Sequence, residues 1–86
     1  MVSKTITVKN KTGLHARPAA LFSKLANTCP CEVSIEKEGK KINAKSILGV
    51  LSLAIVMGSE ITIITEGENE EECLGKLVDF MENLSE

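Results

Sequence analysis

The stretch Gly13-Leu14-His15-Ala16-Arg17-Pro18-Ala19-Ala20 contains the chain's single histidine and predicts the start of a helix. Pro18 fits the first turn of a helix, and the alanines that follow it favour helix. The first backbone N–H groups of a helix have no acceptor within the helix, so they can receive an anion. Neutral imidazole is a nucleophile near neutral pH, and the forked donors of Arg17 suit phosphate oxygens. The stretch therefore predicts a site that holds a phosphoryl group, although such a histidine is more commonly a surface residue or a modest helix cap.

The pattern of apolar residues outward from this stretch predicts alternating strands and helices. The predicted elements are a strand around residues 5–8, a helix over 16–27, strands over 31–36 and 41–44, a short helix over 47–51, a strand over 60–66, and a long helix from about residue 70. This order is typical of an α+β layer with helices on one face of a sheet. The pattern alone equally permits a ferredoxin-like strand order.

The composition indicates one domain, residues 1–86, with a largely aliphatic core. Hydrophobic residues make up 43% of the chain, and Phe22 and Phe80 are its only aromatic residues. The absence of further aromatics and the net charge of −2 argue against binding to nucleic acid. No apolar run approaches the length of a membrane span and no signal-peptide pattern is present, so we expect a cytoplasmic protein without membrane insertion.

The three cysteines do not predict a disulfide framework, because their number is odd. Cys29-Pro30-Cys31 could indicate a metal or redox pair, but it lacks the second pair of ligands that a structural zinc ion needs. We therefore expect no metal and no cofactor. Cys31 is interpreted as an apolar strand residue, Cys29 as a loop residue, and Cys73 as a residue that packs along the final helix.

Two segments resemble signatures of the HPr family, the histidine-containing phosphocarriers of the bacterial phosphoenolpyruvate-dependent sugar phosphotransferase system. The stretch from Gly13 to Ala19 is similar to the active-site signature, and the segment from Lys45 to Leu53 is similar to the regulatory-serine signature. The resemblance covers essentially the whole chain. It implies an open-faced β-sandwich of order βαββαβα, with a four-stranded antiparallel sheet and three helices on one face. In that fold the first and fourth strands are adjacent and the third lies at an edge.

The resemblance also implies a function for the histidine stretch. His15 would accept a phosphoryl group from Enzyme I on Nδ1, as a pros-phosphohistidine, and pass it to sugar-specific IIA proteins. Arg17 would stabilise the transferring group. The protein would then be a carrier with a covalent intermediate rather than a turnover enzyme, and we expect a monomer.

An apolar docking face for these partners is expected near the two segments. Its predicted members are Leu14, Ala20, Ile47, Leu48 and Leu51, with Leu48 as the most exposed. The alternative is that the apolar residues of the short helix belong to the core, and Val50 is the residue most expected there.

Ser46 is the natural N-cap of the short helix, a role that needs no regulation. Its context is similar to the serine phosphorylated by HPr kinase/phosphorylase in Gram-positive bacteria, and the phosphorylated form would bind a catabolite-control transcription regulator. A purely regulatory paralogue is the strongest alternative to a carrier. Such paralogues lack the active-site histidine, whereas His15 is present here. A generic ligand-binding domain would leave both segments as coincidence.

Two positions depart from local expectation. Ala54 stands where relatives often have glycine, so it would be strained if its φ angle is positive. Gly75 lies within the predicted last helix at a cost of about 1 kcal/mol relative to alanine. It should have a packing reason or leave a soft spot.

Overall fold

The computed structural model describes residues 1–85, which form four strands and three helices. In chain order the elements are β1 (Val2–Thr7), α1 (Ala16–Asn27), β2 (Glu32–Lys37), β3 (Lys40–Asn43), α2 (Ile47–Ser52), β4 (Glu60–Glu66) and α3 (Glu70–Glu82). The predicted order βαββαβα is confirmed. The first strand begins earlier than predicted, and Cys31 lies just before β2 rather than within it.

The four strands form one antiparallel sheet in the order β1-β4-β2-β3. The first strand is paired with the fourth over its whole length, and β3 is at an edge. This arrangement is the one that the family resemblance implied, so the ferredoxin-like alternative is not realised.

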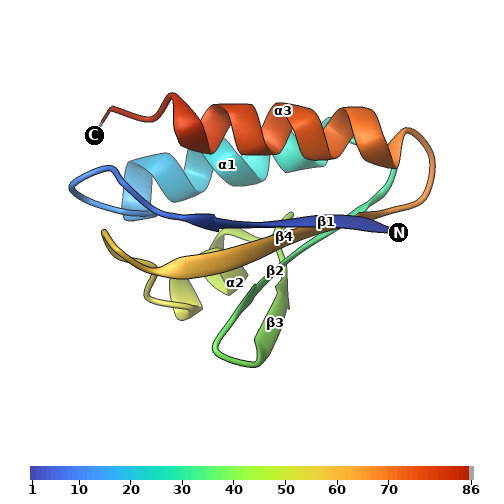
Figure 1. Ribbon diagram of the computed structural model, residues 1–86. Coiled ribbons are helices and arrows are strands. Elements are labelled where there is room, and N and C mark those ends of the chain that lie inside the picture. Colours follow the sequence, from blue (N-terminus) through green and yellow to red (C-terminus); the bar gives the residue numbers. More distant parts are fainter. Residues whose placement is uncertain (86) are drawn as a thin grey trace.

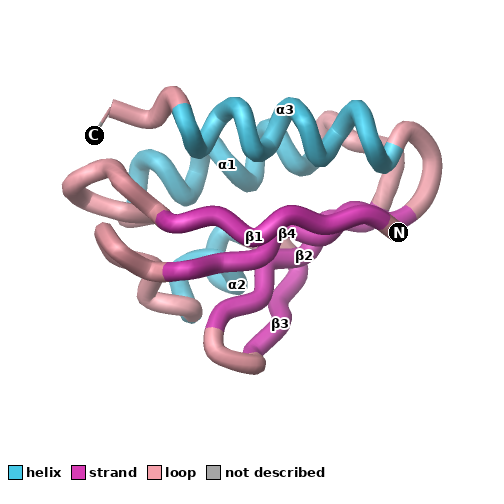
Figure 2. Tube along the Cα trace, viewed as in Figure 1, coloured by secondary structure: helices cyan, strands magenta, loops and turns pink. Residues whose placement is uncertain are grey.

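Helices α1 and α3 lie side by side over one face of the sheet (Figure 1), while α2 lies against α1 and near β3. Figure 2 shows the same layers, with the loops at the two ends of the strands. Alternate residues of the central strands point toward the helices, because successive side chains of a strand face opposite sides. All three helices add buried side chains to the same cluster, which includes Val33, Ile35, Ile61, Ile63, Phe22, Val50 and Leu77. The expected α+β fold with its helices on one face is confirmed.

The predicted turn between β2 and β3 is formed by Glu38 and Gly39, both with positive φ angles, of 51° and 85°. Two successive positive φ angles give the turn type whose twist matches that of the paired strands. This short hairpin fixes β3 at the edge of the sheet.

Ala54 follows α2 with a φ angle of 51°, so the expected strain at this position is confirmed. The Lys37 ammonium group donates to the carbonyl oxygens of Leu53 and Ala54, at 3.0 and 2.9 Å. A cation at these carbonyls is favourable, because they carry the negative end of the helix dipole. Lys37 thus stabilises a helix end whose backbone is strained.

Gly75 is exposed on α3, and a Cβ added there would have no atom within 4 Å. The expectation of a packing reason for Gly75 is therefore wrong. The other expectation, a soft spot in α3, stays a prediction. Among residues 1–85, no helix combines the length and the apolar character needed to cross a membrane.

Candidate phosphoryl-transfer site

His15 occupies the position directly before α1, where its backbone is extended with φ −75° and ψ −170°. Its carbonyl oxygen accepts the hydrogen bond from the Ala19 N–H at 2.8 Å. Its side chain makes no capping hydrogen bond and is exposed. The imidazole therefore does not serve as a helix cap, and it is accessible to a reacting partner.

The start of α1 is an electropositive end. The aligned peptide dipoles place a partial positive charge there, and the first turn contains no acidic residue. Arg17 adds a full positive charge and is exposed on this turn, as is the imidazole of His15 just before it. Pro18 lies in the first turn, as predicted, where a missing N–H costs nothing, and its side chain is buried. The structure thus brings together the histidine, the arginine and the helix start as the sequence predicted.

The loop that leads to His15 is fixed against the segment that follows α2. The Leu14 N–H donates to the Ile55 carbonyl oxygen at 3.1 Å. Gly13 has a φ angle of 62°, and a Cβ added there would lie 2.4 Å from that same oxygen and 2.7 Å from the Cα of Val56. The Asn10 side-chain amide donates to the Gly13 carbonyl oxygen at 2.8 Å. Only a glycine can make this close approach, so Gly13 sets the position of the histidine loop.

The prediction that Leu14 lies on the docking face is wrong, because its side chain is 2% exposed and belongs to the core. Leu14, whose backbone contacts Ile55, has a buried side chain, whereas the next residue, His15, has an extended backbone and an exposed side chain. Ala20 is only half-buried.

Ser46 is the N-cap of α2, as predicted, and its hydroxyl oxygen accepts from the Gly49 N–H at 3.1 Å. The preceding backbone is held by the C-terminal half of α1. Ser23 donates to the Ala44 carbonyl oxygen at 2.9 Å, and Asn27 donates to the Lys45 carbonyl oxygen at 3.0 Å. Ser46 therefore lies beside the C-terminal end of α1, which is the end farthest from His15.

Helix α2 connects these two ends of α1. It begins beside the C-terminal half of α1, and the segment after it reaches the histidine loop at Ile55. The two helices therefore run in opposite directions. Ser46 and His15 lie at opposite ends of α2, which at six residues is about 9 Å long. The short helix is near His15, as expected, but the serine itself is at its distant end.

The exposed side of α2 is apolar. Leu48 is 79% exposed, and Ile47 and Leu51 are 45% and 38% exposed, so the prediction that Leu48 protrudes most among them is confirmed. Val50 is fully buried, which confirms it as the core residue of this helix. The alternative that Ile47 and Leu51 belong to the core is therefore wrong.

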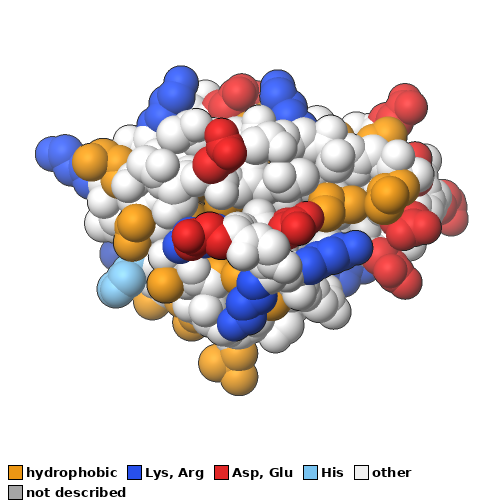
Figure 3. Space-filling view, turned by 60° about the horizontal axis from the view of Figure 1, so that its bottom comes forward, with side chains coloured by type: hydrophobic (Ala, Val, Ile, Leu, Met, Phe, Trp, Pro, Cys, Tyr) orange, Lys and Arg blue, Asp and Glu red, His pale blue; other side chains and the backbone are white. Residues whose placement is uncertain are grey.

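Apart from Met1, sequence reasoning missed three further exposed apolar residues, Leu21 on α1 and the pair Val56 and Met57 after α2. Figure 3 shows exposed hydrophobic side chains on the side of the molecule where the histidine lies. We call the six exposed residues the apolar face: Leu21, Ile47, Leu48, Leu51, Val56 and Met57. Val56 and Met57 could have been identified from the sequence, because they form an apolar pair in the segment between the predicted short helix and the strand that follows it.

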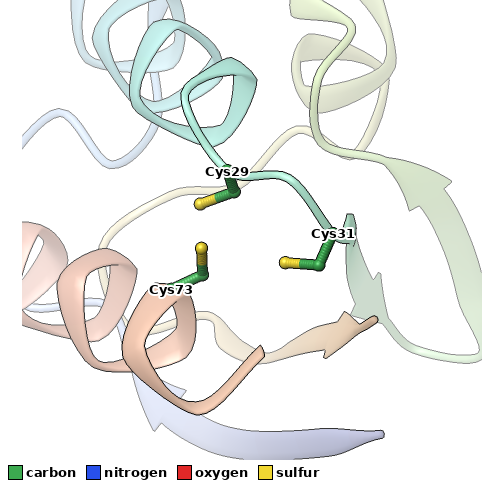
Figure 4. A group of neighbouring side chains, drawn as sticks. All are labelled: Cys29, Cys31 and Cys73. Carbon is green, nitrogen blue, oxygen red and sulfur yellow. The ribbon is translucent and has the colours of Figure 1, made fainter. Parts of the chain in front are cut away.

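The three cysteines, interpreted separately from the sequence, converge in the structure. The sulfur atoms of Cys29, Cys31 and Cys73 all lie within 4.8 Å of one another, and all three side chains are buried (Figure 4). Cys29 lies in a loop, as predicted, but points inward. Burial raises the pKa of the Cys31 and Cys73 thiols above the ordinary value. The prediction of no metal ligands considered only the Cys-x-Cys pair and missed the third thiol.

Comparison with known proteins points to one family. The family model for the PTS HPr component phosphorylation site matches residues 2–83. The HPr-like protein Crh of Halalkalibacterium halodurans is 58% identical over 95% of this chain and 98% of its own. The crystal structure of HPr-C-His from Thermoanaerobacter tengcongensis is 49% identical, covers 95% of this chain and 92% of its own, and superimposes with a TM-score of 0.93.

A third similar protein bears on the oligomeric state. The structure of Bacillus subtilis Crh is 51% identical, with 95% of this chain and 94% of that chain covered and a TM-score of 0.76, and it is a dimer with a swapped domain. This relative does not fit the expectation of a monomer, and we do not retain that expectation.

Proposed function

The chain belongs to the PTS HPr family, and on this premise we propose that it carries a phosphoryl group on His15. In this proposal Enzyme I supplies the group and sugar-specific IIA proteins receive it. The proposal includes a cytoplasmic location. The single observation that carries it is the exposed, uncapped imidazole of His15 at the positive end of α1.

The transfer is a displacement at phosphorus. The Nδ1 atom of His15 uses its lone pair to form the P–N bond, while the bond from phosphorus to the donor breaks and its electrons leave with the donor. Transfer to the IIA protein runs the same step in the other direction. His15 is therefore returned to its starting form after each cycle of acceptance and release.

Arg17 and the first turn of α1 supply donors for the phosphoryl oxygens. Such fixed donors act on charge as it develops during transfer, and they need little reorganisation. The guanidinium group can bind phosphoryl oxygens in a forked geometry. The donors must not hold the group too firmly, because the phosphohistidine has to release it again.

The apolar face is proposed as the surface on which Enzyme I and the IIA proteins dock. It extends along α2 from the region of His15 toward Ser46, and exposed apolar side chains grouped in this way are characteristic of interaction sites. Leu48 is its most exposed member. A partner that covers this face brings its own active site to the imidazole.

Ser46 is proposed as a regulatory site for HPr kinase/phosphorylase. Its hydroxyl group is exposed and already contacts an amide of the first turn of α2. A phosphate adds about −1.5 to −2 charge, which the start of a helix tolerates. The same charge beside Ile47 opposes apolar docking and offers a new surface to a catabolite-control transcription regulator.

The test is transfer of labelled phosphate from phosphoenolpyruvate through Enzyme I. We expect acid-labile phosphate on the wild-type chain and none on His15→Ala. Arg17→Ala should slow transfer in both directions while the fold is kept. Ser46→Ala is the matched control, because it should accept the acid-labile phosphate but lose acid-stable labelling by the kinase. Persistent acid-labile labelling of His15→Ala would refute the carrier function.

The second candidate is a regulatory HPr-like protein that acts through Ser46 without carrying phosphate. It is favoured by the 58% identity to an HPr-like protein Crh. Against it stands His15, the residue whose loss is expected in such proteins. Kinase labelling at Ser46 with no labelling through Enzyme I would select this candidate.

A further inference from the structure

Three thiols meet at the end of the molecule opposite the phosphoryl-transfer site. Cys29 follows the last turn of α1, Cys31 precedes β2, and Cys73 lies in α3. Their sulfur atoms point toward a common centre (Figure 4) and lie within 4.8 Å of one another. The proposed transfer chemistry uses none of them.

We propose that Cys29, Cys31 and Cys73 together bind one Cu(I) ion as a three-coordinate thiolate site. Thiolate is a soft ligand, and soft ligands select Cu(I), zinc and iron–sulfur clusters. The choice among these ions rests on the number of ligands, the spacing of the sulfur atoms and the charge of the surroundings.

The number of ligands disfavours zinc and iron–sulfur clusters. Structural zinc sites almost always have four protein ligands, and iron–sulfur clusters commonly use four thiolates. Within residues 1–85 the group of converging metal ligands consists of these three cysteines. Cu(I) is a closed-shell ion that accepts three thiolates in a plane, so it needs no fourth ligand.

The spacing of the sulfur atoms suits such an ion. With a metal–sulfur bond of about 2.3 Å, three sulfurs around a planar centre are separated by about 4 Å. The sulfurs in the structure lie within 4.8 Å, so each would move by less than about 1 Å to reach the ion. The rotation of three short side chains supplies a movement of this size.

Two lysines partly balance the charge. One Cu(I) ion and three thiolates carry a net charge of −2, and the three thiol protons pass to solvent when the ion binds. The Lys45 ammonium group donates to the Cys29 carbonyl oxygen at 2.9 Å. The positive charge of Lys45 favours the Cys31 thiolate and that of Lys76 favours the Cys73 thiolate, although burial has the larger, opposite effect on the pKa of each thiol. Binding of the Cu(I) ion is therefore what stabilises the thiolates.

The three cysteines lie beside an exposed loop and are remote from His15. Gly67, in the exposed loop between β4 and α3, packs on Cys31, where an added Cβ would lie 3.3 Å from the Cys31 Cβ. Helix α1 spans 12 residues, or about 18 Å, and separates Cys29 at its end from His15 at its start.

The experiment uses the full chain, reduced and kept without oxygen, titrated with Cu(I) in competition with the chelator bicinchoninate. We expect one Cu(I) per chain and a thiolate-to-copper charge-transfer band in the ultraviolet. Cys31→Ala and Cys73→Ala should each weaken the affinity at least about 100-fold, the upper end of what loss of an outer-shell partner costs. The matched control, His15→Ala, should bind as the wild type does.

X-ray absorption of the copper-loaded wild-type chain tests the site without any variant. Three sulfur neighbours at one distance are expected. A shell of two sulfurs, or one that contains nitrogen, would overturn the three-thiolate site. So would equal binding by the chain with all three cysteines changed to alanine, or a higher affinity for Zn²⁺ in the matched competition.

Discussion

The backbone N–H of Leu14 donates to the carbonyl oxygen of Ile55 at 3.1 Å, and this bond joins the histidine loop to the segment that follows α2. It buries the Leu14 side chain and leaves His15 exposed at the start of α1. The helix with the exposed apolar residues and the loop with His15 are therefore held in one arrangement. A disturbance of this contact should affect both folding and transfer.

Gly13→Ala should disturb it. The new Cβ would meet the Ile55 carbonyl oxygen at 2.4 Å, and the positive φ angle alone costs about 1–2 kcal/mol for a residue with a Cβ. We expect a loss of more than about 2 kcal/mol in the free energy of unfolding and slower acceptance of phosphate. Gly39→Ala is the control, because its φ angle is also positive but its Cβ would have open space. Equal losses in urea unfolding for the two variants would show that the close contact is unimportant.

Leu48→Asp should separate docking from folding. Since Leu48 is 79% exposed, the free energy of unfolding should change by no more than about 0.5 kcal/mol. Transfer from Enzyme I should slow at least about tenfold, because a charge replaces an apolar anchor in the interface. Ser3→Asp adds the same charge on β1, at the other end of the molecule from the histidine loop, and should leave the rate unchanged. Transfer assays with limiting Enzyme I measure the rates of both variants. A normal rate in Leu48→Asp would contradict the proposed docking surface.

Ser46→Ala should remove the cap of α2 and lower the free energy of unfolding by about 1 kcal/mol. Ser46→Asp keeps an acceptor for the Gly49 N–H and adds charge at the positive end of the helix, so it should lose less. Ser3→Ala, at an exposed position of β1, is the control and should change stability little. Chemical denaturation decides between these outcomes, and equal stability of wild type and Ser46→Ala would remove the capping role.

Ala54→Gly should stabilise the protein by about 1 kcal/mol, because glycine adopts the φ angle of 51° without the steric cost that alanine has. Gly75→Ala, the opposite change in an exposed and unobstructed helix position, should stabilise by about 0.5–1 kcal/mol. The two sites lie in different elements, so the effects should add in the double variant. A lower melting temperature for either single variant would contradict the backbone explanation.

Glu70 should make stability depend on pH in the acid range. The Gly67 N–H donates to one carboxylate oxygen and the N-terminal ammonium group pairs with the other, each at 2.9 Å, and these contacts hold the pKa of Glu70 below its ordinary value. Stabilisation from a lowered carboxyl pKa is fully present above the pKa of the unfolded chain and is lost as the pH falls through the lowered value.

Glu70→Gln should therefore be less stable than the wild type at neutral pH, and the difference should shrink in acid. Glu71→Gln makes the same change one residue further along the helix, outside the bond to Gly67. Urea unfolding at a series of pH values provides the comparison. A difference that stays constant into acid would mean that the carboxylate charge of Glu70 is not its source.

Local patterns in the sequence were sufficient for the element order and for the cap of α2, and the likeness to relatives indicated the strained position, Ala54. Apolar residues alternate along β4 and recur at helical spacing along α3, because each element is buried on one side. That side recurs every two residues in a strand and about every 3.6 residues in a helix. Ser46 was identifiable as a cap because capping depends on neighbours within three residues. The histidine and arginine could likewise be assigned to one site, since both belong to a single helix start.

Only the tertiary structure decided that Leu14 is buried and that the three cysteines meet. Leu14 is buried because Ile55, 41 positions later in the chain, holds its backbone, and no local period reports such a contact. Cys73 joins Cys29 and Cys31 because α3 packs over the sheet beside the end of α1. The stretch from Gly13 to Ala20 and its resemblance to the family signature thus predict the chemistry, while packing between distant segments decided which of its side chains are exposed and which other groups lie near it.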